Sequence, residues 1–182
     1  MSDLLAKLIF LRGEITSRKV CKMAGSSDKV NVLFVCLGNI CRSPMAEAVF
    51  AHTVNQKQLR DRFGVIDSAG TAGYHVGETP DHRSAQTCRK HGVPVSHHAR
   101  KVHKSDFINF DYILCMDESN LEDLREMAPA GTKATIKLFG EFDPEGDRII
   151  RDPYYGGING FERNFQQVSR ASEGFLQSLG MI

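Results

Sequence analysis

A nearly continuous β-branched and apolar run, Val-Asn-Val-Leu-Phe-Val-Cys, occupies residues 30–36 and constrains the fold more than any other part of the chain. A strand without polar alternation is buried on both faces, which is typical of a parallel sheet covered by helices. Ser43 and Pro44 follow almost at once and predict an N-cap with proline at the first helical position. Apolar residues then recur at helical spacing. The run therefore predicts a strand, a tight loop and a helix.

The same alternation continues to the end of the chain. Further strands are predicted near 63–68, 112–116 and 135–139, and further helices at 83–91, 120–127 and 161–179. Strands that alternate with helices predict an α/β fold of three layers, αβα, around a central parallel sheet of four strands. Ligands of such folds bind beyond the carboxyl ends of the strands, so we expect the site at the loop after the first strand.

A short stretch at residues 24–29, Ala-Gly-Ser-Ser-Asp-Lys, has the composition of a linker. We expect residues 1–29 to be a flexible N-terminal extension and residues 30–182 to be one domain. The formal net charge is +1, from 23 basic and 22 acidic residues, and does not favour non-specific binding of nucleic acid. No apolar run approaches the roughly 18 to 20 residues that cross a bilayer, so no integral membrane segment is expected.

The chain has five cysteines, an odd number without paired CxxC spacing. This pattern argues against a disulfide framework or a zinc site and favours a reducing compartment, so we expect a cytoplasmic protein. Cys88 and Cys115, on a predicted helix and a predicted strand, are expected to be buried structural residues. A monomer is the favoured oligomeric state.

The loop at residues 36–43, Cys-Leu-Gly-Asn-Ile-Cys-Arg-Ser, combines the groups that phosphoryl transfer through a thiol needs. Backbone N–H groups of a short loop that contains Gly38 can converge on an anion, and the following helix adds its positive dipole end. The planar fork of Arg42 can bind two phosphoryl oxygens. A thiol in that field ionises more easily, and the thiolate is the competent nucleophile. Cys36 is therefore expected to attack phosphorus in line from beneath the bound phosphate.

Residues 32–50, Val-Leu-Phe-Val-Cys-Leu-Gly-Asn-Ile-Cys-Arg-Ser-Pro-Met-Ala-Glu-Ala-Val-Phe, resemble the signature of the low-molecular-weight protein tyrosine phosphatases, the eukaryotic-type acid phosphatases. Three further segments look like family segments in family order: Val-Ile-Asp-Ser at 65–68, Asp-Tyr-Ile-Leu-Cys-Met-Asp-Glu-Ser-Asn at 111–120, and Asp-Pro-Tyr-Tyr-Gly at 152–156. The resemblance covers about residues 30–182. It implies hydrolysis of protein phosphotyrosine and of small aryl phosphates through a cysteinyl-phosphate intermediate. That mechanism needs no metal or other cofactor, because arginine and backbone amides supply the charge stabilisation.

The resemblance also assigns roles to residues outside the nucleophile and its arginine. Asp152 matches the family's general acid, which protonates the leaving phenolate oxygen and can act as the base in the second step. Asn39 matches the asparagine that holds the loop in shape, and we expect it in a left-handed conformation. Ser43 is implied to hydrogen-bond the leaving thiolate. Ser68 and His97 are implied to support the loop asparagine.

An aryl ester needs a deep slot with aromatic walls, since a phenyl ring has to reach the thiol at its base. The expected lining is Leu37, Ile40, Tyr74, Tyr154 and Tyr155, with Gly38, Asn39 and Cys41 in the loop below. Animal members of the family often carry tryptophan where this chain has Tyr74, so we expect a different substrate preference. The family also suggests that Tyr154 and Tyr155 are phosphorylation sites.

A second cysteine, Cys41, lies five residues after Cys36 in the same loop. A nucleophilic thiol with a resolving cysteine nearby is the usual arrangement of a redox sensor. The sequence therefore predicts that mild peroxide inactivates the enzyme reversibly through a disulfide between these two residues.

Three alternative functions stay open on the same sequence. An arsenate reductase of this fold relays a disulfide through a closely spaced cysteine pair, whereas this chain has no cysteine between Cys88 and Cys115. Phosphoarginine phosphatases tend to carry threonine where this chain has Ile40, whose apolar side chain favours phosphotyrosine. A non-catalytic phosphate-binding module would lack the nucleophile, the arginine or the acid, and all three are present.

Overall fold

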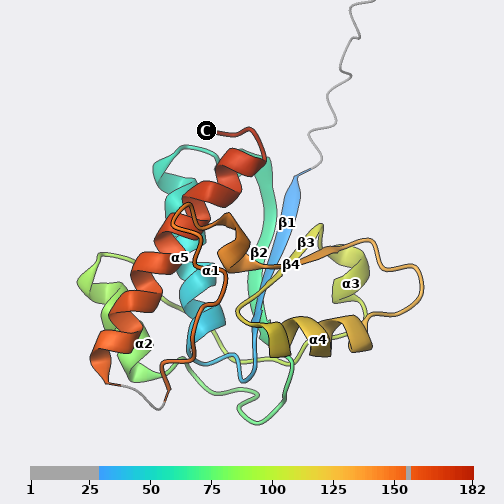
Figure 1. Cartoon of the computed structure of the whole chain (residues 1–182), viewed down its shortest axis with the longest axis horizontal. Helices are drawn as coiled ribbons and strands as arrows, with labels where there is room; N and C mark the ends of the chain where they lie inside the picture. Colours follow the sequence, from blue (N-terminus) through green and yellow to red (C-terminus); the bar gives the residue numbers. More distant parts are fainter. Residues whose placement is uncertain (1–28, 155–156) are drawn as a thin grey trace, which may run out of the picture.

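The computed structural model describes residues 29–154 and 157–182 (Figure 1). Four strands form one sheet: β1 Val30–Cys36, β2 Phe63–Gly70, β3 Tyr112–Cys115 and β4 Thr135–Leu138. Every neighbouring pair is parallel, and the strand order is β2-β1-β3-β4. The predicted parallel sheet of four strands is thereby confirmed. The predicted extension, apart from Lys29, lies outside the described residues.

Helices cover both faces of this sheet (Figure 1). One face carries α1 Arg42–Gln56, α2 His82–Lys90 and α5 Ile158–Ser178, and the other carries α3 Asp106–Asn109 and α4 Glu118–Met127. Two short 3-10 turns, η1 Arg60–Arg62 and η2 Phe139–Phe142, complete the regular structure. The three-layer αβα arrangement is the predicted one. No helix in the described part of the chain has both the length and the apolarity to span a bilayer.

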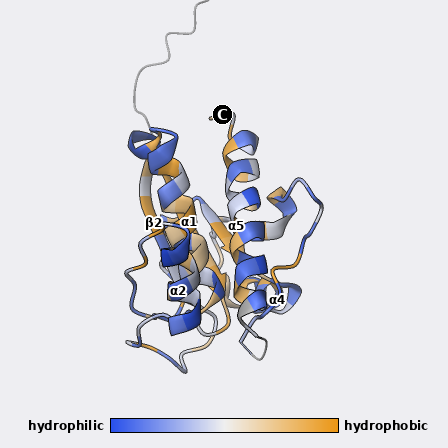
Figure 2. Cartoon of the chain, turned by 90° about the vertical axis from the view of Figure 1, so that its left-hand side faces the viewer, coloured by the Kyte–Doolittle hydropathy of each residue, from blue (hydrophilic) through white to orange (hydrophobic). Residues whose placement is uncertain are grey.

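The central strand β1 shows why the run at residues 30–36 is apolar on both sides. Val32 and Phe34 pack into the core beneath α1 and α5, whereas Leu33 and Val35 pack into the core beneath α3 and α4. All four side chains are fully buried. Hydrophobic colouring is accordingly concentrated in the interior of the molecule, while the outward turns of α2 are hydrophilic (Figure 2).

The carboxyl ends of the strands meet at one edge of the sheet. Cys36 is in register with Gly70 of β2, and Val35 is in register with Cys115 of β3. Gly70 occupies a place where no side chain fits, because a Cβ atom there would lie 2.6 Å from the carbonyl oxygen of Leu37. The loop after β1 therefore lies directly against the end of β2.

The helix after β1 begins earlier than predicted. Cys41 is its N-cap and Arg42 its first residue, so the prediction of Ser43 as the N-cap is wrong, and Pro44 is the third helical residue instead of the first. Proline is tolerated there because the N–H groups of the first turn have no partner within the helix. The Ser43 hydroxyl is thus free of a capping role and turns toward the sulfur of Cys36.

Candidate active site

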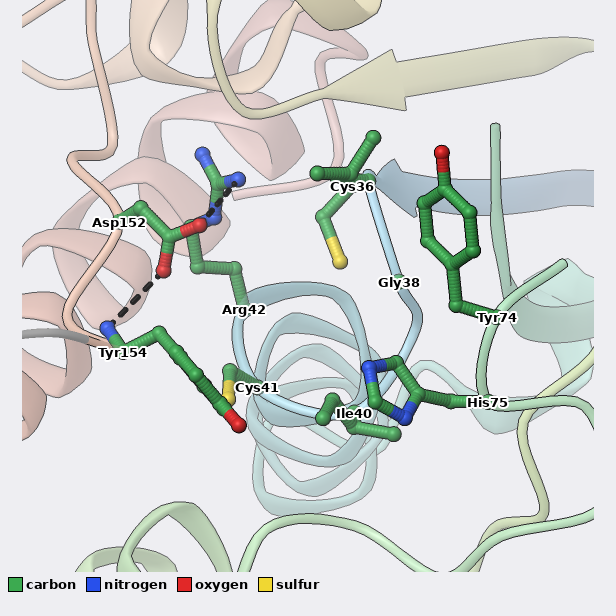
Figure 3. Close-up of a pocket in the computed structure, with 10 residues that line it drawn as sticks. Cys36, Gly38, Ile40, Cys41, Arg42, Tyr74, His75, Asp152 and Tyr154 are labelled. Carbon is green, nitrogen blue, oxygen red and sulfur yellow. Dashed lines mark hydrogen bonds and ion pairs between the residues drawn. The ribbon is translucent and has the colours of Figure 1, made fainter. Parts of the chain in front are cut away.

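A cavity of about 300 Å³ opens at the carboxyl edge of the sheet, over the loop at residues 36–43, here called the cysteine loop (Figure 3). Its lining consists of Cys36, Leu37, Gly38, Ile40, Cys41, Arg42, Tyr74, His75, Asp152 and Tyr154. The sulfur of Cys36 points into the cavity, although the residue is only 3% exposed (Figure 3). The structure thus brings the predicted nucleophile, arginine and acid together in one cavity.

The sulfur of Cys36 lies among hydrogen-bond donors. The backbone N–H of Asn39 donates to it at 3.3 Å, and the hydroxyl oxygen of Ser43 is 3.1 Å away. When the sulfur is a thiolate, only the hydroxyl can be the donor of that second bond. Both groups therefore stabilise negative charge on the sulfur.

Asn39 organises the cysteine loop from behind. Its φ of 57° lies in the left-handed region, as predicted, and its side chain is buried. Its amide nitrogen donates to the hydroxyls of Ser43 and Ser68, both at 2.9 Å. Its amide oxygen accepts from His97 Nε2 and from the backbone N–H of Arg100, both at 2.8 Å. The structure thus places Ser68 and His97 against the loop asparagine and outside the cavity.

Acidic residues hold His97 from its other side. Nδ1 lies 3.0 Å from Glu47 Oε2 and 3.9 Å from Asp67 Oδ1. In the described part of the chain, this trio is the one cluster spaced to hold a metal ion, with ligand atoms within 4.8 Å of one another. Glu47 Oε2 already accepts a hydrogen bond from Ser68 at 2.7 Å, and Asp67 Oδ2 pairs with Arg100 at 2.9 Å. The cluster therefore serves as the outer support of the loop asparagine.

Arg42 lines the cavity on the side of Asp152, across from Tyr74 (Figure 3). Its guanidinium is buried, pairs with Asp117, donates to the carbonyl of Ile150 at 3.2 Å and lies 3.1 Å from Asp152 Oδ2. Burial by itself lowers the pKa of Arg42, but the negative charges of Cys36 and the two aspartates offset it, and the pKa is raised. The arginine therefore keeps a fixed positive charge beside the sulfur.

Sequence reasoning assigned no role to Asp117. This residue lies two positions after the end of β3, and its carboxylate also caps α4 by accepting the N–H of Asn120 at 2.9 Å. Because it leaves the carboxyl end of a parallel strand, the rule that located Cys36 could have located it as well. His75 was missed too, and no sequence signal distinguishes it from other loop histidines.

Asp152 lies at the rim of the cavity on the loop before α5. Its Oδ1 accepts the backbone N–H of Tyr154 at 3.0 Å, which leaves Oδ2 facing Arg42 (Figure 3). Tyr154 and Tyr74 stand on opposite sides of the opening (Figure 3), and Tyr74 is 79% exposed. The opening thus has an aromatic residue on each side. Tyr155 lies outside the described residues.

The cysteines differ in their surroundings. Cys41 is buried in the cavity wall, and burial together with the negative charge of Asp81 raises the pKa of its thiol. Cys88 and Cys115 are fully buried, and burial raises the pKa of each to about 12. The prediction that these two are buried is confirmed.

Comparison with known proteins gives a consistent match. A family model described as "Low molecular weight phosphotyrosine protein phosphatase" matches residues 31–181. The Homo sapiens protein of that name is 52% identical over 157 residues, which is 85% of this chain and 98% of that protein. A protein tyrosine phosphatase from Entamoeba histolytica has a similar structure, with a TM-score of 0.80 and 38% identity over 84% of this chain and 97% of that one. The drosophila arginine phosphatase is also similar, with a TM-score of 0.78 and 41% identity over 82% and 98% of the two chains.

Proposed function

The chain belongs to the low molecular weight phosphotyrosine protein phosphatase family, and we propose that it hydrolyses phosphotyrosine in proteins, and small aryl phosphates, through a cysteinyl-phosphate intermediate. Its relatives are protein tyrosine phosphatases, so it is an enzyme that acts on phosphoric monoesters. One observation supports the mechanism above all: Cys36, Arg42 and Asp152 face the same cavity. These groups are the nucleophile, the fixed cation and the acid that the reaction needs.

In the first step the Cys36 thiolate attacks phosphorus. The S–P bond forms while the bond from phosphorus to the phenolic oxygen breaks, and Asp152 in its acid form donates a proton to that oxygen. Arg42 and the N–H groups of the cysteine loop bind the remaining phosphoryl oxygens and offset their charge. The phenol leaves, and the phosphoryl group stays on sulfur.

In the second step water replaces sulfur. Asp152, now a carboxylate, takes a proton from the attacking water while the P–O bond forms and the S–P bond breaks. The electron pair returns to the sulfur of Cys36. The Ser43 hydroxyl at 3.1 Å and the Asn39 N–H at 3.3 Å stabilise the thiolate that leaves.

Turnover of para-nitrophenyl phosphate and phenyl phosphate in millimolar EDTA tests this mechanism. We expect the unchanged protein to be fully active in EDTA, and Cys36→Ser to lose about 10³-fold or more of kcat, because the hydroxyl is a much weaker nucleophile. Asp152→Ala should lose about 10²-fold or more of kcat/KM with phenyl phosphate, the poorer leaving group, and less with para-nitrophenyl phosphate. Full activity of Cys36→Ser, or equal losses of Asp152→Ala on both substrates, would contradict the mechanism.

Two related activities are less well supported by the site. The likeness to the drosophila arginine phosphatase makes phosphoarginine the competing substrate, but the apolar Ile40 in the cavity wall favours an aromatic ester. Arsenate reduction needs a relay of cysteines, whereas Cys88 and Cys115 are buried in cores on opposite faces of the sheet. Two peptides that differ only in carrying phosphotyrosine or phosphoarginine distinguish the phosphotyrosine phosphatase from the phosphoarginine phosphatase. We expect faster release of phosphate from the phosphotyrosine peptide.

We also propose that Cys41 protects the enzyme from irreversible oxidation. Both Cys36 and Cys41 line the cavity, so a sulfenic acid on Cys36 has a thiol within the same wall. Peroxide should oxidise the Cys36 thiolate to the sulfenic acid, and the Cys41 sulfur then forms the disulfide as water leaves. Peptide mapping after mild peroxide should find this disulfide, and dithiothreitol should restore activity. Cys41→Ser is the matched variant. After peroxide treatment, we expect dithiothreitol not to restore its activity. Irreversibly oxidised Cys36 with a free Cys41 in the unchanged protein would contradict the proposal.

We further propose a cytoplasmic monomer. Cys36, Cys41, Cys88 and Cys115 are unpaired, which suits a reducing compartment. Cys36, Arg42 and Asp152 of a single chain face the same cavity, so the proposed reaction does not require a second copy.

A further inference from the structure

Arg83 lies on the first turn of α2 and connects the two segments that form the active site. We propose that Arg83 is a positioning residue for Asp152, because it holds the segment at residues 151–154, here called the acid loop, at a fixed place relative to the cysteine loop. This inference rests on the proposed role of Asp152 as the general acid.

The N-terminal end of α2 is fastened to the cysteine loop. The backbone N–H of Asp81 donates to the carbonyl of Ile40 at 2.8 Å, and the hydroxyl of Ser84 donates to the carbonyl of Cys41 at 2.9 Å. Ser84 is buried, so water does not compete for the second bond. The start of α2 and the cysteine loop therefore form one rigid unit.

Asp81 fixes the orientation of the Arg83 guanidinium. Its carboxylate accepts from Arg83 Nε at 3.0 Å and from Nη2 at 2.7 Å, and it also accepts the backbone N–H of Arg83 at 2.8 Å as the N-cap of α2. Two parallel bonds between a planar guanidinium and a carboxylate leave little rotational freedom. The remaining nitrogen, Nη1, is thus directed away from α2.

That nitrogen reaches the acid loop. Arg83 Nη1 donates to the carbonyl of Tyr154 at 3.0 Å, and the guanidinium lies over the rings of Tyr154 and Phe161, 5.4 and 4.7 Å from their centroids. The backbone N–H of Tyr154 in turn donates to Asp152 Oδ1 at 3.0 Å. A continuous series of contacts therefore runs from the cysteine loop through Arg83 to the carboxylate of Asp152.

The placement of Asp152 needs such support. Its side chain is 41% exposed and lies 3.1 Å from Arg42, and Asn164 also holds the acid loop by donating to the carbonyl of Arg151 at 3.0 Å. A general acid has to lie within hydrogen-bond reach of the leaving oxygen, and a displacement of about 1 Å can cost about 10²-fold in rate. Loss of Arg83 should therefore impair proton donation by Asp152 and leave attack by sulfur less affected.

The test compares Arg83→Met, which keeps the length of the side chain, with Arg89→Met, an exposed arginine of the same helix, as the control. kcat/KM is measured with phenyl phosphate and para-nitrophenyl phosphate, because this parameter reports the step in which the phenol leaves. We expect Arg83→Met to lose about 10-fold with phenyl phosphate and about 2-fold with para-nitrophenyl phosphate, and Arg83→Lys to lose less, since lysine keeps one donor. Arg89→Met should match the unchanged protein on both substrates.

A second variant, Asp152→Asn, separates this inference from the proposed function. If Arg83 acts through Asp152, Arg83→Met adds no further loss in the Asp152→Asn background. The positioning role would be overturned if the losses of Arg83→Met and Asp152→Asn multiplied in the double variant. Equal losses of Arg83→Met on both substrates would overturn it as well. If Asp152→Asn alone leaves the dependence on the leaving group unchanged, the acid role itself is wrong. Thermal melting shows whether each variant folds, and if Arg83→Met does not, Arg83→Lys is tested in the same way.

Discussion

At the scale of single residues, Asn39 combines an unusual backbone conformation with a complete set of side-chain hydrogen bonds. Its φ is 57°, and its amide bonds four partners on neighbouring segments. The left-handed region costs most side chains about 1–2 kcal/mol and costs glycine almost nothing. Two substitutions of Asn39 therefore separate the contribution of its backbone conformation from that of its side-chain hydrogen bonds.

Replacing Asn39 by glycine keeps the conformation and removes the amide, whereas alanine loses both. We expect both variants to lose about 10²-fold of kcat/KM, because the hydroxyl of Ser43 loses its orienting donor. Asn39→Ala should also be less stable than Asn39→Gly by about 1 kcal/mol in urea denaturation. Gln58, which has a φ of 59° and is not among the residues that line the cavity, is the control, and Gln58→Gly should leave kcat/KM unchanged. Full activity of Asn39→Gly would show that the amide is dispensable.

At the scale of secondary-structure elements, an ion pair between the buried Asp143 and the half-buried Arg170 ties α5 to the segment after η2. Arg170 Nε and Nη2 donate to the two carboxylate oxygens of Asp143, at 2.9 and 2.8 Å, and Asp143 also accepts the N–H of Glu145 at 3.0 Å. Burial by itself raises the pKa of Asp143, but these donors outweigh it and hold the pKa below its ordinary value. The charged carboxylate therefore stabilises the folded state.

This pair makes part of the stability dependent on pH. A carboxyl whose pKa is lowered by folding contributes fully above its ordinary pKa, 3.8 for Asp143, and loses the contribution as the pH falls through the lowered value. Asp143→Asn should reduce the free energy of unfolding by about 1–3 kcal/mol at pH 7, and the difference from the unchanged protein should shrink in acid. Urea denaturation measures the free energy of unfolding of both proteins at pH 7 and at the lowest pH at which they stay folded.

The exposed pair between Lys57 of α1 and Glu173 of α5, 3.1 Å apart, is the matched control. Exposed pairs contribute about 0–1 kcal/mol, so Glu173→Gln should change little at either pH. A difference between Asp143→Asn and the unchanged protein that stays constant into acid would show that the charge of Asp143 is not the source of its stabilising effect.

The elements with a clear hydrophobic pattern were the predictable ones. The strand at residues 30–36 has the predicted bounds, and the other predicted strands and helices agree with the structure to within three residues at each end. The turns α3, η1 and η2 were not predicted, since a single turn shows no helical period. The residue type of Ser43 predicts an N-cap, whereas the N-cap is Cys41 and the Ser43 hydroxyl lies 3.1 Å from the sulfur of Cys36.

At the scale of the whole molecule, contacts between distant segments decide the site. Cys36 and Arg42 belong to one continuous loop, and a chemical argument from the sequence could reach them. Asp117, Glu47 and Arg83 lie 81, 11 and 47 positions from Cys36 along the chain. Strand pairing brings Asp117 to Arg42, whereas helix packing places Glu47 against Ser68 and Arg83 against the acid loop. Glutamate and arginine are common on protein surfaces, so no local pattern marks Glu47 and Arg83, whereas Asp117 lies beyond the carboxyl end of a predicted strand.

The positions of the two cores and of the cavity along the chain predict the effect of removing the first 28 residues. Both cores and all the residues that the structure shows lining the cavity lie between Val30 and Ile182. The first strand is also held at its start, because the N–H of Asn31 donates to Asp111 Oδ2 at 2.7 Å. A chain that begins at Lys29 should therefore keep kcat/KM within about 2-fold and its melting temperature within about 2 °C. Removal of Val30 and Asn31 as well is the contrasting variant, and it should lower the melting temperature because it cuts into β1. A loss of activity above about 5-fold in the chain that begins at Lys29 would mean that the first 28 residues contribute to the site, and the proposed domain boundary would then be wrong.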